Sequence, residues 1–567
     1  MKKNKEENKE ELAESFVVNS ESVPEDIPLR EEITHVANIY AKEISLSQQT
    51  EGPKIHVDEI ASGVAKFYEK IRKIIDWKDD NALRRGAIER ILKRRLLPKM
   101  VTGVFKEEDT FQLAKTMTEE LIRGGHLPND EVPESRVPVV AESLKKYLYF
   151  LKYSIKQYGI TNVKKGNAQT NFIIETAACE VEEVLARPVK EHGIIDAMSK
   201  IMSAKIRVSP EGFLSEEEKL DLVRISVQRE LYHLDNNYIV YMYMRRKYPN
   251  WGNLSSEELL WFAKNLLTIK EASEEYVNSK ICKKFDEIIA QFSAVFILLD
   301  DVFNDLKDHP EMIEEKINDK TFLLSSIREH YENRRTTLQR RLRNTAIFST
   351  LSVFISNWAT FYLIEVPVAR LFYEEFNLLA TIIDFLLPAL VMFLLVIFIK
   401  PPQEDNLEKV LDASRDLLYQ NPRSEKFDIK MNEEIPALGR FFVTLFYIMA
   451  TILLFVGIGY VFYIAKLPMT SVIYDTFTIA ITFYAALGVR KKSKELQVSN
   501  DRKLGEFLFD VFTVPVAKVG GFLSSKWKEY NVVAIFTNYL VEVPLVAILD
   551  FTEMWSKFIK ERKAEID

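Results

Sequence analysis

The sequence predicts an all-α protein: a multi-helix cytoplasmic domain, then a four-span helical membrane domain, then C-terminal amphipathic helices. Three observations predict this class. Glycine supplies only 18 of the 567 residues, which disfavours turn-rich β architectures. Apolar residues recur at helical spacing in the first half. Four apolar stretches in the second half are long enough to cross a bilayer.

Composition and charge exclude several classes of protein. Hydrophobic residues make up 47% of the chain and the net charge is −7, so the chain is not wholly disordered. Its two cysteines, Cys179 and Cys282, cannot form a disulfide framework or a four-thiolate zinc site. The N-terminus is too charged for a secretory signal. Residues 1–54 mix charged and polar side chains, and we expect them to form a disordered tail.

Residues 55–340 are predicted to form the cytoplasmic helical domain. Two capping boxes, at 215–218 and 255–258, each precede an amphipathic stretch. Breaks are expected near 127–138, 159–166, 209–212, 249–254 and 309–310. Proline suits the first helical turn, so the last helix is expected to run from Pro310 without a break into the first span.

One helix of this domain is strongly basic. Its cationic residues are Arg84, Arg85, Arg90, Lys93, Arg94, Arg95 and Lys99. Such a helix can lie on anionic lipid or bind phosphates, and without aromatic residues to stack bases it favours lipid over nucleic acid. The alternative, held at equal weight, is a packed helix whose charges pair with acidic neighbours. No specific nucleic acid is expected as a partner.

The membrane domain is assigned to residues 341–490, with spans at about 345–364, 376–399, 441–464 and 467–489. Basic residues gather before the first span, between the second and third, and after the fourth, whereas the two other loops hold only Arg370 and Lys466. This alternation predicts a multi-pass protein of a cytoplasmic-type membrane with both termini in the cytoplasm.

Polar residues form stripes on the predicted spans. Asp384 and Asp475 lie at equal depth on two parallel spans, together with Thr381, Thr478 and Thr482. Two carboxyl groups at one depth are a candidate proton or cation site, because charge within a bilayer is costly. The interpretation that we favour is that small and hydroxylated residues allow tight helix packing.

A second acidic group, Asp300, Asp301 and Asp305, closes an apolar helical run in the soluble half. It loosely resembles the first aspartate-rich motif of isoprenoid synthases, which implies Mg²⁺ bound to a diphosphate. No second motif accompanies it, so an exposed acidic last turn is the preferred interpretation. No nucleotide-binding glycine motif is present, and we expect neither a metal nor a cofactor.

Residues 491–567 are predicted to form amphipathic helices on the cytoplasmic membrane surface, anchored by Trp527 and Trp555. The whole pattern predicts an integral membrane protein that presents a large helical domain for scaffolding, sensing or partner binding. Its expected partners are membrane lipids and a cytoplasmic protein. The alternatives are a small cation- or proton-coupled carrier using Asp384 and Asp475, and a membrane-bound metal-dependent enzyme using Asp300, Asp301 and Asp305.

Overall fold

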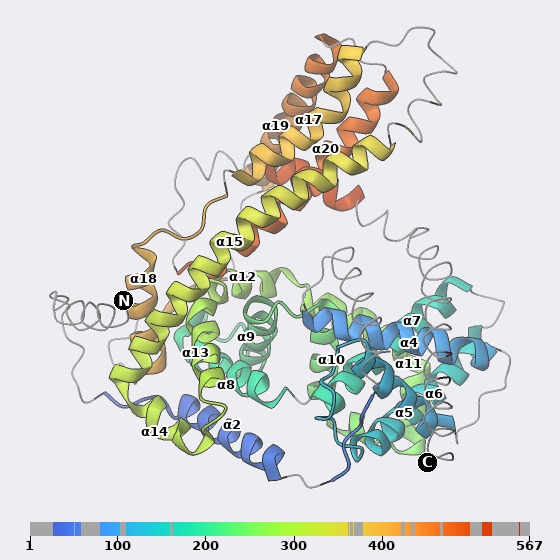
Figure 1. The fold of residues 1–567 in the computed structure, drawn as a ribbon, viewed down its shortest axis with the longest axis vertical. Coiled ribbons are helices and arrows are strands. Elements are labelled where there is room, and N and C mark those ends of the chain that lie inside the picture. Colours follow the sequence, from blue (N-terminus) through green and yellow to red (C-terminus); the bar gives the residue numbers. More distant parts are fainter. Residues whose placement is uncertain are drawn as a thin grey trace, which may run out of the picture.

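The computed structural model is mostly helical, which confirms the all-α class (Figure 1). It describes residues 27–49, 52–57, 80–101, 109–158, 163–186, 188–360, 362, 367, 378–397, 399–420, 426–431, 437–464, 469–498, 513–523, 551 and 555. Four helices form an elongated arm, which projects from a larger helical body. The arm comprises residues 341–360 of α15 (Lys320–Thr360) with α17 (Leu378–Ile397), α19 (Ala437–Ile464) and α20 (Met469–Ser493).

The body has two halves that meet along a seam. The outer half contains α4 (Asp80–Val101), α5 (Asp109–Arg123), α6 (Arg136–Tyr158), α7 (Val163–Ala186), α10 (Asn236–Lys247), η1 (Pro249–Gly252) and α11 (Ser256–Val277). The root half, next to the arm, contains α2 (Glu31–Gln49), α8 (Val189–Lys205), α9 (Glu216–Leu231), α12 (Lys280–Ile289), α13 (Ser293–Asp305), η2 (Pro310–Met312) and α14 (Ile313–Asn318). α7 belongs to the outer half, and α8, the next helix along the chain, belongs to the root half (Figure 1).

Both capping boxes predicted from sequence are confirmed. The Ser215 hydroxyl accepts a hydrogen bond from the Glu218 amide, and the Glu218 carboxylate accepts one from the Ser215 amide, at the start of α9. Ser255 and Glu258 make the same reciprocal pair at the start of α11. Each box satisfies amide groups that have no partner within the helix.

The expected disordered tail is wrong for part of its range. Residues 31–49 form α2, which packs on α8. Ile33, Val36 and Ala37 are buried and bring an apolar stripe against α8. The charged residues between them made this segment look disordered by composition, although its helical spacing was present. Residues 1–26 of the predicted tail lie outside the described residues.

The long helix that enters the arm begins later than expected. The chain from Pro310 forms η2 and α14, and α15 starts at Lys320 rather than continuing from Pro310. Asp319 separates the two helices: its backbone is extended, and its carboxylate accepts hydrogen bonds from the amides of Thr321 and Phe322. Aspartate is a favourable N-cap residue, and Asp319 is both the residue at which α14 ends and the N-cap of α15. From there α15 continues unbroken past the predicted domain boundary at 340/341.

The segment between α17 and α19 returns to the body. Its helix α18 (Asn406–Leu418) is followed by strand β2 (Phe427–Lys430), which pairs in parallel with β1 (Ile206–Ser209) of the root half. The Arg30 amide also donates to the Leu418 carbonyl at 2.9 Å. After α20, Leu496 and Val498 hydrogen-bond to the buried side chain of Asn406, which also donates to the Tyr331 hydroxyl on α15. Both helical hairpins of the arm therefore begin and end at the body.

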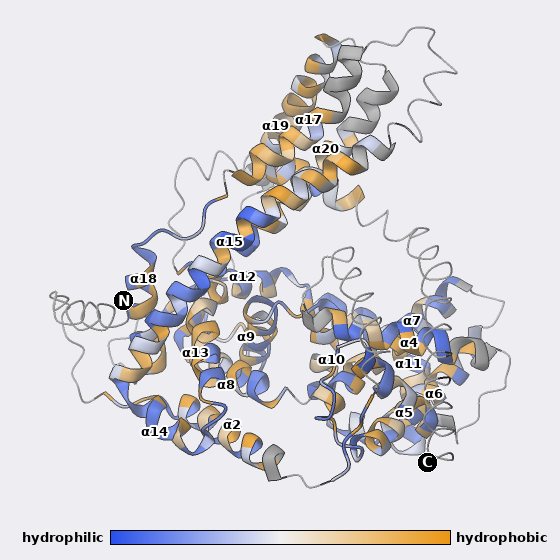
Figure 2. Ribbon diagram, viewed as in Figure 1, coloured by the Kyte–Doolittle hydropathy of each residue, from blue (hydrophilic) through white to orange (hydrophobic). Residues whose placement is uncertain are grey.

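The arm carries most of the exposed apolar surface. α17 packs on both α15 and α20, while α19 packs on α20. Hydrophobic residues cover the arm, and α15 changes from hydrophilic to hydrophobic along its length as it leaves the body (Figure 2). Within the described part of the chain, however, one helix is both long and apolar enough to cross a membrane, at Thr444–Val461 of α19. The four-span domain predicted from sequence is not supported by that criterion.

The predicted surface helices of residues 491–567 are described only in part. Residues 513–523 form a helix in which Val516 and Ala517 are buried. Gly520 lies so close to α20 that a Cβ atom there would overlap the carbonyl oxygen of Ala480. This helix therefore packs along the arm, rather than lying apart from it. Trp527 lies outside the described residues, and Trp555 is exposed.

Candidate functional site

The basic helix predicted from sequence, α4, packs into the outer half. Arg85 is only 3% exposed, and Arg94 and Arg95 both pair with Glu120 of α5. Arg84, Arg90 and Lys93 are partly exposed, and the side chain of Lys99 lies outside the described residues. Arg85 is buried and cannot reach a lipid surface. For this residue the structure agrees with the alternative prediction, a packed helix whose charges are paired with acidic neighbours. A lipid role for the others stays a prediction.

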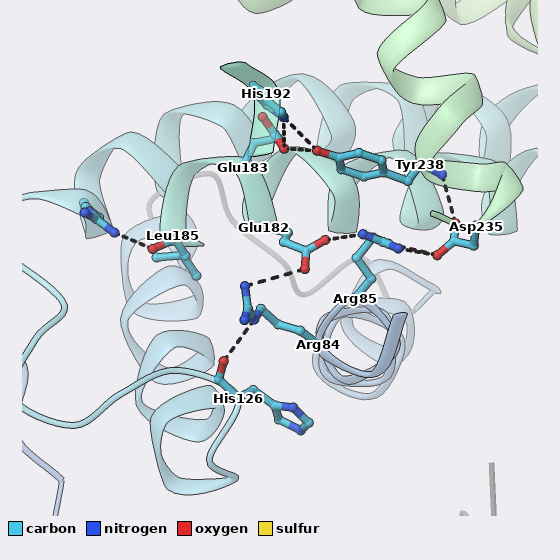
Figure 3. A network of polar contacts seen from close by, with 10 residues as sticks. Arg84, Arg85, His126, Glu182, Glu183, Leu185, His192, Asp235 and Tyr238 are labelled. Atoms are coloured by element: carbon cyan, nitrogen blue, oxygen red, sulfur yellow. Dashed lines mark hydrogen bonds and ion pairs between the residues drawn. The ribbon is translucent and has the colours of Figure 1, made fainter. Parts of the chain in front are cut away.

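The Arg85 guanidinium joins α4 to α7 and α10 (Figure 3). It donates to Glu182 at 2.6 Å and through Nε to Asp235 at 3.0 Å, and it lies over the Tyr238 ring at 4.6 Å. Asp235 also accepts from the Tyr238 amide as the N-cap of α10. Burial alone would lower the pKa of Arg85, but the adjacent carboxylates raise it, so the guanidinium stays charged. A buried charge is tolerated here because each donor has an acidic partner.

A second cluster faces the seam from the other side of α7 (Figure 3). The Tyr238 hydroxyl donates to Glu183, and His192 lies 3.1 Å from that hydroxyl and 3.4 Å from the Glu183 carboxylate. Burial raises the pKa of Glu183, but the hydrogen bonds with His192 and Tyr238 outweigh burial, and the net pKa is lowered. Glu183 is therefore held as a carboxylate.

These two clusters line a cavity of about 370 Å³ in the seam. Positive charge comes from Arg84, Arg85 and Lys190, and negative charge comes from Glu43, Glu182, Glu183 and Glu191. Lys190 is itself paired with Asp300, at 2.8 Å. Because both signs are present and mostly paired, the cavity does not favour an anion or a cation by charge. The buried Cys179 thiol is no nucleophile here, because burial raises its pKa well above the usual value.

A third buried network lies one turn earlier on α7. Glu180 accepts hydrogen bonds from Lys146 at 2.7 Å, from the Tyr147 hydroxyl at 2.6 Å and from the Trp251 indole at 3.2 Å. Lys146 also donates to the Trp251 carbonyl at 2.8 Å. Burial lowers the pKa of Lys146, against the opposing effect of Glu180. The network joins α6, α7 and η1, and its complete pairing indicates a structural role.

The three aspartates of α13 have separate basic partners. Asp300 pairs with Lys190, Asp301 pairs with Arg334 of α15 at 2.8 Å, and Asp305 pairs with His330 at 3.0 Å. Arg334 also binds Glu495, at 3.1 Å, and so links α13 to the residues after α20. Across the described residues, no group of three or more potential ligands is placed to hold a metal ion. Two of the aspartates therefore connect α13 to the part of α15 that lies before the arm, and Asp300 connects α13 to α8.

The polar candidates on the predicted spans are described mainly by their backbones. Asp384 and Thr381 lie on α17, and Asp475 lies on α20, but their side chains are outside the described residues. The two helices pack against each other. Thr478 is half-buried, and the buried Thr482 hydroxyl donates to the Thr478 carbonyl at 2.8 Å within its own helix. Thr482 is thus satisfied without a ligand.

Sequence reasoning missed the seam cluster of Glu182, Glu183, His192, Asp235 and Tyr238. The signal that was available is a run of glutamates, 180, 182 and 183, within an otherwise apolar stretch of α7. Acids on a buried helix face require basic partners, but the sequence does not say that these partners come from α4, α6 and α8. Comparison with protein-family models, with curated proteins and with solved structures finds no match.

Proposed function

We propose that the chain is an integral membrane protein whose arm crosses a bilayer four times and holds the body at the cytoplasmic face. The body acts there as a scaffolding or sensing domain that docks a protein partner. Within the described residues one helix has the length and composition to span a membrane, at Thr444–Val461. The support for the other spans comes from how side chains are distributed over the arm.

The observation that carries the proposal is that α15 and α20 expose large apolar side chains while burying hydroxyl groups together with apolar residues such as Ile479. Ser349 is 3% exposed and Thr482 is 2% exposed, whereas Phe348 is 64% exposed and Tyr484 is 46% exposed. In water the apolar side chains would be the buried ones. In lipid the polar groups must be satisfied within the protein, and apolar groups face outward.

The lengths of the arm helices support the same interpretation. α17 has 20 residues, α20 has 25 and α19 has 28. At a rise of 1.5 Å per residue these helices are about 30, 38 and 42 Å long, enough for a hydrocarbon core of about 30 Å. The polar stripes that lower the apolar character of α15 and α20 are the kind of surface that packs between helices.

The connections support the orientation. Both hairpins return to the body, through α18 with β2 and through residues 494–498. Three basic residues, Arg490, Lys491 and Lys492, lie in the last turn of α20, at its body end. Cytoplasmic loops carry the excess of basic residues, so the body is on the cytoplasmic side.

Cysteine labelling in sealed proteoliposomes tests the topology. Single cysteines are introduced at Ile464, the last residue of α19, and at Glu404 and Glu216, whose side chains are 90% and 86% exposed on the body side. An impermeant maleimide added outside should label position 464 in one protein orientation and positions 404 and 216 in the other. The native Cys179 and Cys282 are buried and serve as an internal control for background.

Simultaneous labelling of positions 464 and 404 from the same side would contradict a spanning arm. The result must also hold in oriented vesicles, where a protease added outside reports which side the body occupies. Protection of the body together with labelling at 404 by the external reagent would likewise be inconsistent with the proposal.

The carrier alternative is kept because α17 and α20, which bear Asp384 and Asp475, are packing neighbours. Asp384→Asn and Asp475→Asn distinguish it, since an amide keeps hydrogen bonding but cannot ionise. If the stripes only pack, both variants fold and show the same vesicle pH response as the unmodified protein. Loss of a protein-dependent pH response in both variants, with folding intact, would replace the scaffold proposal with a carrier.

A further inference from the structure

We infer that Arg340, Arg341, Arg343 and Lys400 form a cationic collar that binds the phosphate groups of anionic phospholipids in the leaflet next to the body. The inference rests on the proposed function, because it requires the arm to lie in a bilayer. It adds a lipid class and names the residues that select it.

The three arginines of the collar are exposed on α15 and have no ion-pair partner among the residues that the structure describes. Two arginines that precede them on α15 are paired instead: Arg334 with Asp301 and Glu495, and Arg335 with Glu332 and Glu404. Between the collar arginines, Leu342 is buried. The helix therefore packs through its apolar face, and the arginines point away from that contact.

The position of the collar along the arm matches a head-group layer. Ile347 and Phe348, the first strongly exposed apolar residues of α15, lie four to eight residues above the collar arginines. That spacing is about 6–12 Å along a helix. The polar layer on each side of a bilayer is about 5–8 Å thick, and arginine side chains extend toward it. Lys400 likewise lies close to the exposed apolar surface of α17, because it follows the exposed Ile397 by three residues.

A cavity lies beside the collar and shows which of its charged groups lacks a partner. It has a volume of about 340 Å³, and Arg341 is part of its lining. The other charged residues of this lining are paired, Arg334 with Asp301 and Glu495, and His330 with Asp305. Arg341 is thus the charged residue of the lining that lacks a partner within the described part of the chain. A lipid phosphate supplies the missing acceptor, and guanidinium groups bind phosphate with two parallel hydrogen bonds.

The test uses full-length protein in nanodiscs of phosphatidylcholine that contain a trace of spin-labelled phosphatidylglycerol or spin-labelled phosphatidylcholine. Electron paramagnetic resonance measures the fraction of each lipid immobilised by the protein. The unmodified protein should retain phosphatidylglycerol several-fold more strongly than phosphatidylcholine. R340Q/R341Q/R343Q should lower that ratio by roughly fivefold or more, and added salt should lower the ratio for the unmodified protein.

Two variants keep the test specific. K264Q/K283Q/K307Q removes three exposed lysines of the body, giving the same change in net charge, and should leave the ratio unchanged. R340K/R341K/R343K keeps the positive charge and should retain most of the preference. A ratio near one for the unmodified protein, or an unchanged ratio for the glutamine variant, overturns the collar while the arm still lies in the disc. Failure of the unmodified protein to enter discs at all overturns the membrane proposal as well.

Discussion

The body and the arm are both helical, but they differ in which side chains they bury. In the body, α13 buries Phe296, Leu298 and Phe303 completely and leaves its acidic residues to pair at the surface. On α19 of the arm, Met449 and Leu453 are 62% and 66% exposed. This contrast is the one expected if, as proposed, the body lies in water and the arm lies in lipid: removal of apolar surface from water would stabilise the body, whereas packing and internal hydrogen bonds would stabilise the arm.

The body and the arm also differ in the kind of polar group that they bury. The body buries ionised side chains such as Arg85, Glu182 and Lys146, each with a charged partner from another helix. The described side chains of the arm bury hydroxyl groups, such as those of Ser349 and Thr482, which donate to carbonyls of their own helix. Long-range pairs therefore specify the arrangement of the body, and local bonds leave the arm helices free to pack by shape.

The largest expected effect tests the charge pairs of the body. Arg85→Ala leaves Glu182 buried without its main partner, and should destabilise the protein by about 3–5 kcal/mol. Thermal unfolding of the full chain in detergent, followed by circular dichroism, measures the loss. Arg328→Ala is the matched control, because its pair with Glu408 is exposed on both sides and should contribute about 0–1 kcal/mol. Equal effects of the two substitutions would contradict the distinction.

The second prediction compares one leucine from each region. Leu298→Ala creates a cavity in the body core and should cost about 3 kcal/mol. Leu453→Ala on α19 removes a side chain that faces detergent or lipid, and should change the same unfolding transition by less than about 1 kcal/mol. If the arm packed against the body or another protein surface in water, Leu453→Ala would be the more damaging of the two.

The third prediction concerns pH. Burial raises the pKa of Glu175 to about 7, and the nearby Glu89 adds to the effect. The folded state then binds more protons than the unfolded state between pH 4.5 and 7, so stability falls as pH rises through this range. Each pH unit corresponds to about 1.4 kcal/mol, so Glu175→Gln should be more stable than the unmodified protein by about 2–3 kcal/mol at pH 8.

The two proteins should have equal stability near pH 4.5, which serves as the internal control for the Glu175 experiment. Stability curves measured between pH 4.5 and 8 in the same detergent provide the comparison. A constant difference across the range would mean that the substitution acts through packing, rather than through ionisation.

The smallest expected effect tests the close approach on the arm. Gly520→Ala places a methyl group against the backbone of Ala480 and should weaken packing of residues 513–523 by about 1–2 kcal/mol. Hydrogen–deuterium exchange of that segment measures the change. Gly457→Ala on α19 is the control, because a methyl group there meets no neighbouring atom. Unchanged exchange at 513–523 in Gly520→Ala would show that the helix does not depend on this contact.

Sequence patterns alone were enough to predict the helical class, the capping boxes at Ser215 and Ser255, and the separation of a charged half from an apolar one. These features are local: capping needs residues three apart, and amphipathic spacing repeats within a few turns. The same local rules failed at α2, whose charged composition concealed an apolar stripe, and at Asp319, which caps α15 and separates it from α14.

The contacts between residues far apart in the sequence depend on the folded arrangement of the helices. Arg85 pairs with Glu182 and Asp235, which lie 97 and 150 residues away in the sequence. Strand β2, which follows the first hairpin of the arm, pairs with β1 of the body. Asp301 is similarly joined to Arg334, although its own sequence context resembled a metal-binding motif. Such partners are chosen by the packing of whole helices, and the hydrophobic spacing that forms a helix carries no information about which distant side chain will neutralise its buried charges.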